Sequence, residues 1–207
     1  MLRKLQFIFI SLIFFNCLST GQNIDIKVLR EINLNRNTYL DGTYKAITNS
    51  AAPISVGIPV GMLGIGLIKG DSVLIRNAVV IGASVVSSAI VCKIIKNTVQ
   101  RPRPYTTYPD IEKMTSGGGY SFPSGHTSGA FSLATSLSLE YPKWYVIVPS
   151  YAWASAVAYS RMDLGVHYPS DVLMGAVLGV GSAYLCHYLN KKFFKVLPYY
   201  GCHRLKR

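Results

Sequence analysis

Charged residues, and acidic ones above all, are scarce in this sequence. Only 14% of its 207 residues are charged, with 9 Asp and Glu against 21 Lys and Arg, while 50% are hydrophobic. About a quarter of the residues of a soluble domain are usually charged, so this deficit favours a membrane protein. A net charge of +12 is common in nucleic-acid-binding proteins. No basic helix interleaved with aromatic residues is present, however, and we predict no nucleic-acid partner.

Cysteine is also rare and lacks the spacing of a metal or disulfide site. The four cysteines, Cys17, Cys92, Cys186 and Cys202, form no CxxC pair, and two of them lie within apolar runs. This pattern argues against a disulfide framework and against a zinc site. No cluster of Asp, Glu and His has metal-ligand spacing either, so we expect neither a metal nor an organic cofactor.

The first 50 residues divide into two segments of different character. Residues 1–21 have a basic start, a short apolar stretch and then small residues, which is typical of a signal peptide. An uncleaved first membrane anchor is the alternative. Residues 22–50 are polar and partly amphipathic, with Ile26, Leu29 and Ile32 at every third position. We expect this second segment to form surface-lying helices in the periplasm.

Long apolar runs dominate the rest of the chain. They cover residues 51–68, 77–95, 127–139, 144–160 and 172–189. Runs near twenty residues are transmembrane candidates. The sequence therefore predicts an all-α, membrane-embedded helical bundle with about five to six transmembrane helices and its main domain at residues 51–190. A soluble protein with buried helices is the alternative.

Two pairs of glycines within these runs have the spacing of close helix contacts. They are Gly57 with Gly61, and Gly175 with Gly179. Because glycine has no side chain, two helices can approach each other closely at such a pair. Both pairs therefore allow close helix contact inside a bilayer.

The distribution of basic residues predicts the orientation in the membrane. If Met1 starts in the cytoplasm and each run crosses once, the basic tail at residues 191–207 falls inside, as the positive-inside rule requires. With the leader, this favours a bacterial inner-membrane protein with a cytoplasmic tail. Two outside segments, residues 96–126 and 160–171, also contain cations. The rule does not account for these, so we expect them to have a function.

The outside cations lie in short blocks that also contain two histidines and a carboxylate. The residues are Lys96, Arg101 and Arg103 in KNTVQRPRP, His126 in PSGH, and Arg161, His167 and Asp171 in SRMDLGVHYPSD. Guanidinium and ammonium groups bind phosphate oxygens, and a glycine-rich loop before a helix start adds backbone N–H groups. One histidine can attack phosphorus while the other donates a proton to the leaving oxygen. A carboxylate four residues after His167 can hold its imidazole in one tautomer.

Together these blocks resemble the signature of the type 2 phosphatidic acid phosphatase superfamily. That signature reads K-x6-R-P, then P-S-G-H, then S-R-x5-H-x3-D. Here its positions are Lys96 to Pro104, Pro123 to His126 and Ser160 to Asp171, and every position is filled. The blocks occur in family order over more than a third of the chain. The apolar runs around them are similar to those of the membrane-bound branch.

The resemblance implies a helical bundle that hydrolyses a phosphate ester or anhydride without a metal, through a phosphohistidine. It implies His167 as nucleophile, His126 as general acid and Asp171 as the partner of His167. The phosphate would be held by Lys96, Arg103, Ser124, Gly125 and Arg161. In a membrane, this implies a phosphorylated lipid substrate at the periplasmic face. Undecaprenyl pyrophosphate, phosphatidic acid, phosphatidylglycerophosphate and lipid A phosphates all fit.

Three other functions are open at this point. They are a secreted soluble acid phosphatase, a vanadate-binding haloperoxidase of the same superfamily, and a catalytically silent lipid-binding or transport protein. The uncharged eighteen-residue run argues against the first, the short chain against the second, and the complete signature against the third. Outside the signature, we expect Arg101 to be solvated or to contact lipid headgroups, Asp163 to pair locally and His187 to be structural.

Overall fold

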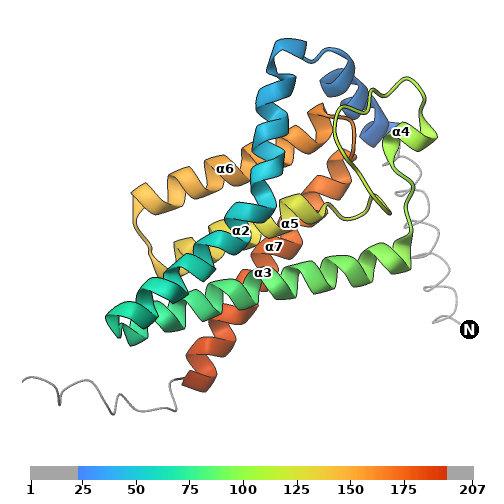
Figure 1. Cartoon of the computed structure of the whole chain (residues 1–207). Coiled ribbons are helices and arrows are strands. Elements are labelled where there is room, and N and C mark those ends of the chain that lie inside the picture. Colours follow the sequence, from blue (N-terminus) through green and yellow to red (C-terminus); the bar gives the residue numbers. More distant parts are fainter. Residues whose placement is uncertain (1–22, 195–207) are drawn as a thin grey trace, which may run out of the picture.

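The computed structural model describes residues 23–194, and all the regular structure in that range is helical. In chain order the elements are a helix at residues 23–34, η1 (Thr38–Leu40), α2 (Asp41–Lys69), α3 (Ser72–Val99), α4 (Pro104–Thr107), α5 (Gly125–Glu140), α6 (Trp144–Asp163) and α7 (Pro169–Phe194) (Figure 1). The predicted all-α class is confirmed. The predicted signal peptide or anchor at residues 1–21 lies outside the described residues, as does most of the predicted tail.

The turn between α2 and α3 is determined by two adjacent residues. Gly70 ends α2 with φ 64°, a left-handed conformation that glycine adopts without steric cost. The carboxylate of Asp71 then accepts the first N–H groups of α3, as an N-cap should. Gly66 allows the start of α3 to pack closely against the end of α2, because a Cβ at Gly66 would lie 2.8 Å from Cγ1 of Ile75. The two long helices therefore lie side by side.

The centre of the bundle is α5, which packs on α3, α6 and α7. Its closest seam is with α7, where a Cβ at Gly175 would lie 2.6 Å from the carbonyl oxygen of Ser124. One turn further along, a Cβ at Gly179 would overlap the backbone of Ser128. The close contact that the spacing of Gly175 and Gly179 allows is thus formed.

The other glycine pair makes no close helix contact within residues 23–194. A Cβ at Gly57 or Gly61 would meet nothing within 4 Å, so these two residues face open space instead of a neighbouring helix. The Gly-x-x-x-Gly spacing shows only that a close approach is sterically allowed. Which face of α2 packs depends on the partners that the rest of the fold brings to it.

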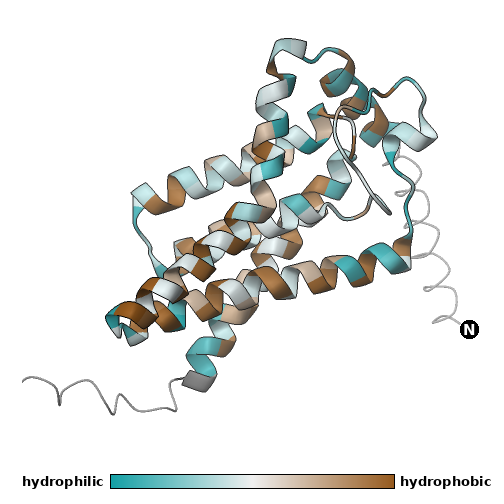
Figure 2. Ribbon diagram, viewed as in Figure 1, coloured by the Kyte–Doolittle hydropathy of each residue, from teal (hydrophilic) through white to brown (hydrophobic). Residues whose placement is uncertain are grey.

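Three segments among residues 23–194 are long and apolar enough to cross a membrane: Thr38–Lys69, Ser72–Thr107 and Pro169–Lys192. Their outer surfaces are apolar (Figure 2), with exposed Val56, Val60 and Ile68 on α2, Val86 and Ile90 on α3, and Leu173 and Val177 on α7. A membrane-embedded bundle is thus confirmed, and the predicted count of five to six spans is approximate. α5 has only 16 residues, and buried hydroxyls such as Ser128 and Ser132 lower its hydropathy.

The helix at residues 23–34 covers the end of the bundle where α4 lies (Figure 1). Its Ile26 and Leu29 are buried in a cluster with Ile111 and Tyr168, whereas Ile24 is 60% exposed. The apolar face of this amphipathic helix therefore packs on the loops that contain Ile111 and Tyr168. α2 already begins at Asp41, before the start of the apolar run.

Candidate active site

The signature residues lie on or beside five helices whose ends meet at one end of the bundle. Lys96 is in the last turn of α3, and Arg103 directly precedes α4. Ser124 precedes α5, and Gly125 and His126 are in its first turn. Arg161 is near the end of α6, His167 is in the link to α7, and Asp171 is in the first turn of α7. Gly125 is exposed, Lys96 and His126 are half-buried, and the rest of the set is buried. The structure thus brings residues separated by up to 75 positions into one region.

His167 is fully buried and lies between a carboxylate and a guanidinium. Its Nδ1 lies 3.3 Å from Oδ2 of Asp171, and its Nε2 lies 3.4 Å from Nη1 of Arg103. A carboxylate accepts a proton and a guanidinium can only donate one. These contacts are both favourable only if Nδ1 carries the hydrogen and Nε2 keeps its lone pair. The site therefore selects the tautomer in which Nε2 is free to attack.

Burial also keeps this imidazole neutral. Loss of solvation lowers the pKa of His167 from 6.5 to about 3; the nearby carboxylate of Asp171 opposes this shift, and the charges of Arg103 and Arg161 add to it. Only the neutral form has a lone pair on Nε2. Near pH 7 His167 is therefore ready to act as a nucleophile.

Asp171 is held in place by several donors. Its Oδ2 accepts the hydroxyl of Ser121 and, at 3.0 Å, the backbone N–H of Tyr168. Its Oδ1 accepts Nη1 of Arg101 at 2.7 Å. A fully buried carboxylate needs such partners, since an unpaired buried charge is strongly destabilising.

The three signature cations are bound by a run of backbone carbonyls in residues 116–121, which we term the glycine loop. Each of its six successive carbonyls accepts a hydrogen bond. Arg161 donates to Ser116, and Tyr105 donates to Gly117. Arg103 donates to Gly118 and Gly119, and Lys96 donates to Tyr120 and Ser121. None of these three cations forms an ion pair within residues 23–194. Carbonyls orient the cations without neutralising them, so their charge is available to an anion.

The glycines of this loop have a steric role. A Cβ at Gly117 would lie 2.9 Å from Nη1 of Arg103 and 3.2 Å from its Cζ, while Gly119 has φ 64°. The first residue lets the backbone pass close to the guanidinium, and the second takes a conformation that other residues rarely adopt. The glycine-rich sequence is therefore required for the carbonyls to reach the cations.

Arg161 is 2% exposed, yet its guanidinium is only partly bonded. Nη1 donates to Oγ1 of Thr48 on α2 at 2.7 Å, and Nη2 reaches the carbonyl of Ser116 at 3.4 Å. Its Nε has no hydrogen-bond partner among the described residues. A buried donor without a partner is costly, which is consistent with a ligand that supplies the missing acceptor.

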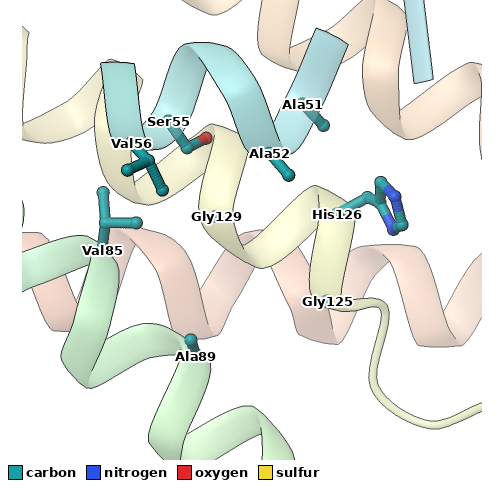
Figure 3. A pocket seen from close by; sticks show the side chains of 9 residues that line it. All are labelled: Ala51, Ala52, Ser55, Val56, Val85, Ala89, Gly125, His126 and Gly129. Atoms are coloured by element: carbon teal, nitrogen blue, oxygen red, sulfur yellow. The ribbon is translucent and has the colours of Figure 1, made fainter. Parts of the chain in front are cut away.

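His126 lies beside an apolar cavity of about 360 Å³ between α2, α3 and α5. Figure 3 shows its ring at one end of the cavity, near Ala51 and Ala52, with Val56 and Val85 at the other end. Burial, followed by the charges of the three signature cations, lowers the pKa of His126 to about 4. Without a bound anion this histidine is therefore neutral near pH 7.

Ser124 connects the start of α5 to α7. Its backbone N–H donates to the carbonyl of Asp171 at 2.9 Å, and its hydroxyl accepts from Thr127 at 2.9 Å. Gly125, by contrast, is exposed at the helix start. The backbone N–H of Ser124, a residue expected to hold the phosphate, is thus already bonded within the protein.

Two expectations about residues outside the signature are wrong. Arg101 is not solvated: it bonds to Asp171 and to Asp25, both at 2.7 Å. Asp163 does not pair with its neighbour Arg161, whose guanidinium turns to Thr48, and Oδ2 of Asp163 has no hydrogen-bond partner among the described residues. The expectation for His187 agrees with its 2.7 Å contact with Glu140, away from the site.

The part of the chain that the structure describes contains no group of three His, Cys, Asp or Glu side chains arranged to hold a metal ion. The acidic and histidine residues of the site are Asp171, His167 and His126. The first two contact each other and the third lies on a separate helix.

Comparison with known proteins shows which family the chain belongs to. The family model described as PAP2 superfamily matches residues 77–195, which is more than half of the chain, and the chain belongs to this superfamily. The chain is 36% identical to a lipid A 4'-phosphatase of Bacteroides thetaiotaomicron over 37% of its own length and 34% of that protein's length. It is 29% identical to an undecaprenyl-diphosphatase of Sulfolobus acidocaldarius over 84% and 82% of the two chains.

The fold is also that of a solved membrane protein. A transmembrane PAP2-type phosphatidylglycerolphosphate phosphatase of Bacillus subtilis superposes with a TM-score of 0.68 over 90% of this chain and 94% of its own, at 24% identity. The first curated relatives are covered only in part, because the match spans 34% of the lipid A 4'-phosphatase and 48% of a bacitracin transport permease protein of Bacillus licheniformis.

Proposed function

We propose that this protein is a metal-independent phosphatase that hydrolyses a phosphorylated or pyrophosphorylated lipid through a phosphohistidine. The observation that carries the proposal is the environment of His167. One ring nitrogen faces Asp171 and the other faces Arg103, so the free lone pair lies beside a cation that can bind phosphate. The family membership supports the same reaction class.

In the proposed first step, the substrate phosphate binds to Lys96, Arg103 and Arg161, which keep their bonds to the glycine loop. Nε2 of His167 attacks phosphorus, and the bond between phosphorus and the leaving oxygen breaks. His126 donates its proton to that oxygen. Asp171 holds Nδ1–H and stabilises the positive charge that forms on the imidazole.

In the second step, His126 is neutral and takes a proton from water as the water attacks the phosphohistidine. The bond between phosphorus and Nε2 breaks, inorganic phosphate is formed, and His167 returns to its starting tautomer. His126 regains the proton that it needs for the next cycle. No further reactant is required.

The electrostatics of His126 fit this double role. Its pKa of about 4 in the empty site reflects burial and three nearby cations. A bound phosphate adds negative charge beside the same cations, which favours the protonated form. Substrate binding therefore favours the protonated form of His126, which can donate to the leaving oxygen.

The lipid class is supported by an apolar groove that continues from His126. The cavity beside this residue adjoins a second one of about 410 Å³ between α2 and α3, and both are lined by Ser55, Val56 and Val85. An apolar tail in this groove would place its headgroup next to the proposed acid. The names of the relatives, which include a lipid A phosphatase and an undecaprenyl-diphosphatase, share only this lipid class.

We further propose that the protein lies in a bacterial inner membrane with its site facing the periplasm. The positive-inside pattern of the loops supports this orientation. In this proposal residues 1–21 are a signal peptide or anchor, 22–50 a periplasmic segment, 51–190 the phosphatase domain and 191–207 a cytoplasmic tail.

A panel of lipid phosphates in detergent, assayed with and without excess EDTA, tests the function. We expect phosphate release from at least one lipid at the same rate in both conditions, because Lys96, Arg103 and Arg161 supply the charge that a metal would otherwise provide. Activity lost in EDTA and restored by a divalent ion would contradict the assignment of the phosphate site. Binding of lipid without any phosphate release would favour a silent lipid-binding or transport protein.

A further inference from the structure

Arg101 is not part of the signature, yet it lies between two carboxylates. Its Nη1 donates to Oδ1 of Asp171, and its Nη2 donates to Oδ2 of Asp25, each at 2.7 Å. The guanidinium also stacks 3.8 Å from the centre of the Tyr168 ring. A planar guanidinium with fixed donor directions is suited to such a bridge, and a lysine is not.

Asp25 is anchored to the same turn of α7. It accepts the backbone N–H of Ser170 at 2.8 Å and also the hydroxyl of Ser170. Ser170 immediately precedes Asp171, and Arg101 donates to the hydroxyl of Ser170 as well. The helix at residues 23–34 is therefore tied to the start of α7 through a closed set of polar contacts.

This bridge completes the bonding of Asp171. Its Oδ2 has three partners, namely Ser121, Tyr168 and His167, whereas Arg101 is the partner that the described residues provide for Oδ1. If Arg101 is removed, a fully buried oxygen loses its donor and the carboxylate loses its counterion. A carboxylate that turns or becomes protonated to relieve this cost no longer holds Nδ1–H of His167 in place.

We propose that Arg101 and Asp25 are positioning residues for the reaction: Asp25 holds Arg101, Arg101 holds Asp171, and Asp171 orients the nucleophile. The inference rests on the proposed function, since it takes His167 as the nucleophile. It gives the helix at residues 23–34 a part in the chemistry, although that helix lies outside the family match at residues 77–195.

The first test compares kinetic variants with a matched control. Arg101→Gln should lower kcat by about 10- to 100-fold, the effect of losing one hydrogen bond to a charged group. Asp25→Asn should give a smaller loss, and Arg101→Lys should recover part of the rate. The inhibition constant for inorganic phosphate should change by less than about twofold, because neither residue binds phosphate. Phosphate binding that weakens as much as kcat falls would overturn the proposal.

The control is Asp110→Asn, which removes an exposed ion pair between the same helix and another loop, Arg30 to Asp110 at 2.7 Å. If the helix has only a structural role, Asp110→Asn and Asp25→Asn should lower the rate equally, and this result would also refute the proposal. We expect the control to keep the wild-type rate within about twofold, as surface ion pairs contribute little.

A double-mutant cycle tests whether Arg101 acts through Asp171. If it does, adding Arg101→Gln to Asp171→Asn should cost much less than it costs in the wild type. Losses that multiply would show that the two residues act independently and would exclude the proposed chain of contacts.

Hydrogen exchange tests the bridge without relying on activity. Arg101→Gln should speed exchange both at residues 23–34 and at residues 168–172, while Asp110→Asn should leave the second segment unchanged. Unaltered exchange at 168–172 in Arg101→Gln would refute the bridge. A wild-type protein without hydrolysis or phosphohistidine would instead refute the proposed function, and the exchange result would still decide the bridge.

Discussion

Nη1 of Arg103 lies 3.4 Å from Nε2 of His167, the nitrogen that is turned away from Asp171. The guanidinium thus lies beside the nitrogen that we propose to attack phosphorus. Arg103 also donates to the carbonyls of Gly118, Gly119 and Val166 at 2.8 to 3.0 Å, which fixes its plane. A phosphate bound to this guanidinium would therefore lie close to the lone pair of His167.

The two histidines should have separable roles. His167→Ala should abolish both turnover and the alkali-stable phosphoprotein. His126→Ala should lower turnover of a lipid substrate by about 10²- to 10⁴-fold but lower that of an aryl phosphate much less, because a good leaving group needs no proton. The measurement is turnover of both substrates together with labelled protein after alkaline and acid quench.

The control for the histidines is His187→Asn, which removes a histidine that contacts Glu140 outside the site. It should retain activity within a few fold. Alkali-stable label in His167→Ala would show that the nucleophile lies elsewhere, and His126 would be the next candidate.

Adjacent glycines in the glycine loop should tolerate alanine unequally. A Cβ at Gly117 would press on the guanidinium of Arg103, which three carbonyls hold in place, whereas a Cβ at Gly118 would meet nothing within 4 Å. We expect Gly117→Ala to weaken inhibition by inorganic phosphate by about tenfold, the loss of roughly one charged hydrogen bond. Gly118→Ala should change it by less than about twofold. Equal effects would contradict the steric role of the loop.

The groove between α2 and α3 should matter only for substrates with a long tail. Val56→Trp fills the wall shared by the two cavities and should raise KM for a lipid phosphate, while leaving KM for an aryl phosphate nearly unchanged. Leu173→Trp, on the exposed face of α7, places the same bulk elsewhere and serves as the control. If both substrates are affected alike by Val56→Trp, the tail does not lie in this groove.

The orientation can be tested with reporter fusions. Fusions after Lys192 should behave as cytoplasmic, and fusions within residues 106–118 as periplasmic, because the basic tail at residues 191–207 fits the positive-inside rule. The histidines lie at the same end of the bundle as the second set. The reverse pattern would place the chemistry in the cytoplasm and change the pool of lipids that it meets.

Acid should destabilise the protein partly through His167. The folded-state pKa of His167, about 3, lies below the value of about 6.5 for an unfolded chain. The fold therefore favours neutral His167. The contribution of neutral His167 to the free energy of unfolding is complete above pH 6.5 and is lost progressively as the pH falls towards 3. Thermal unfolding in detergent at pH 7 and pH 5 should show a smaller decrease in Tm for His167→Gln than for the wild type. Equal decreases would mean that His167 is protonated in the fold.

The sequence predicts the helical bundle and the residues of the proposed site, because apolar runs and signature blocks are local patterns. Contacts between distant segments are different. Nothing near Asp25 indicates that it meets Arg101, 76 positions away, and the adjacency of Asp163 to Arg161 suggests a pair that does not form. Each partner is decided by which elements pack together. The same reason explains why Gly57 faces open space although its spacing permits a helix contact.

The seam at Gly175 and Gly179 has a consequence for how substrate preference can change. α5 carries His126, α7 carries Asp171, and their backbones meet where a single methyl group would overlap the neighbouring chain. The tight packing of these two helices therefore fixes the positions of His126 and Asp171 relative to each other. The side chains that line the apolar groove, where we propose that the lipid tail lies, come mainly from α2 and α3, outside that seam. Substitutions there can adapt the protein to another tail while the distances between the reacting groups stay the same.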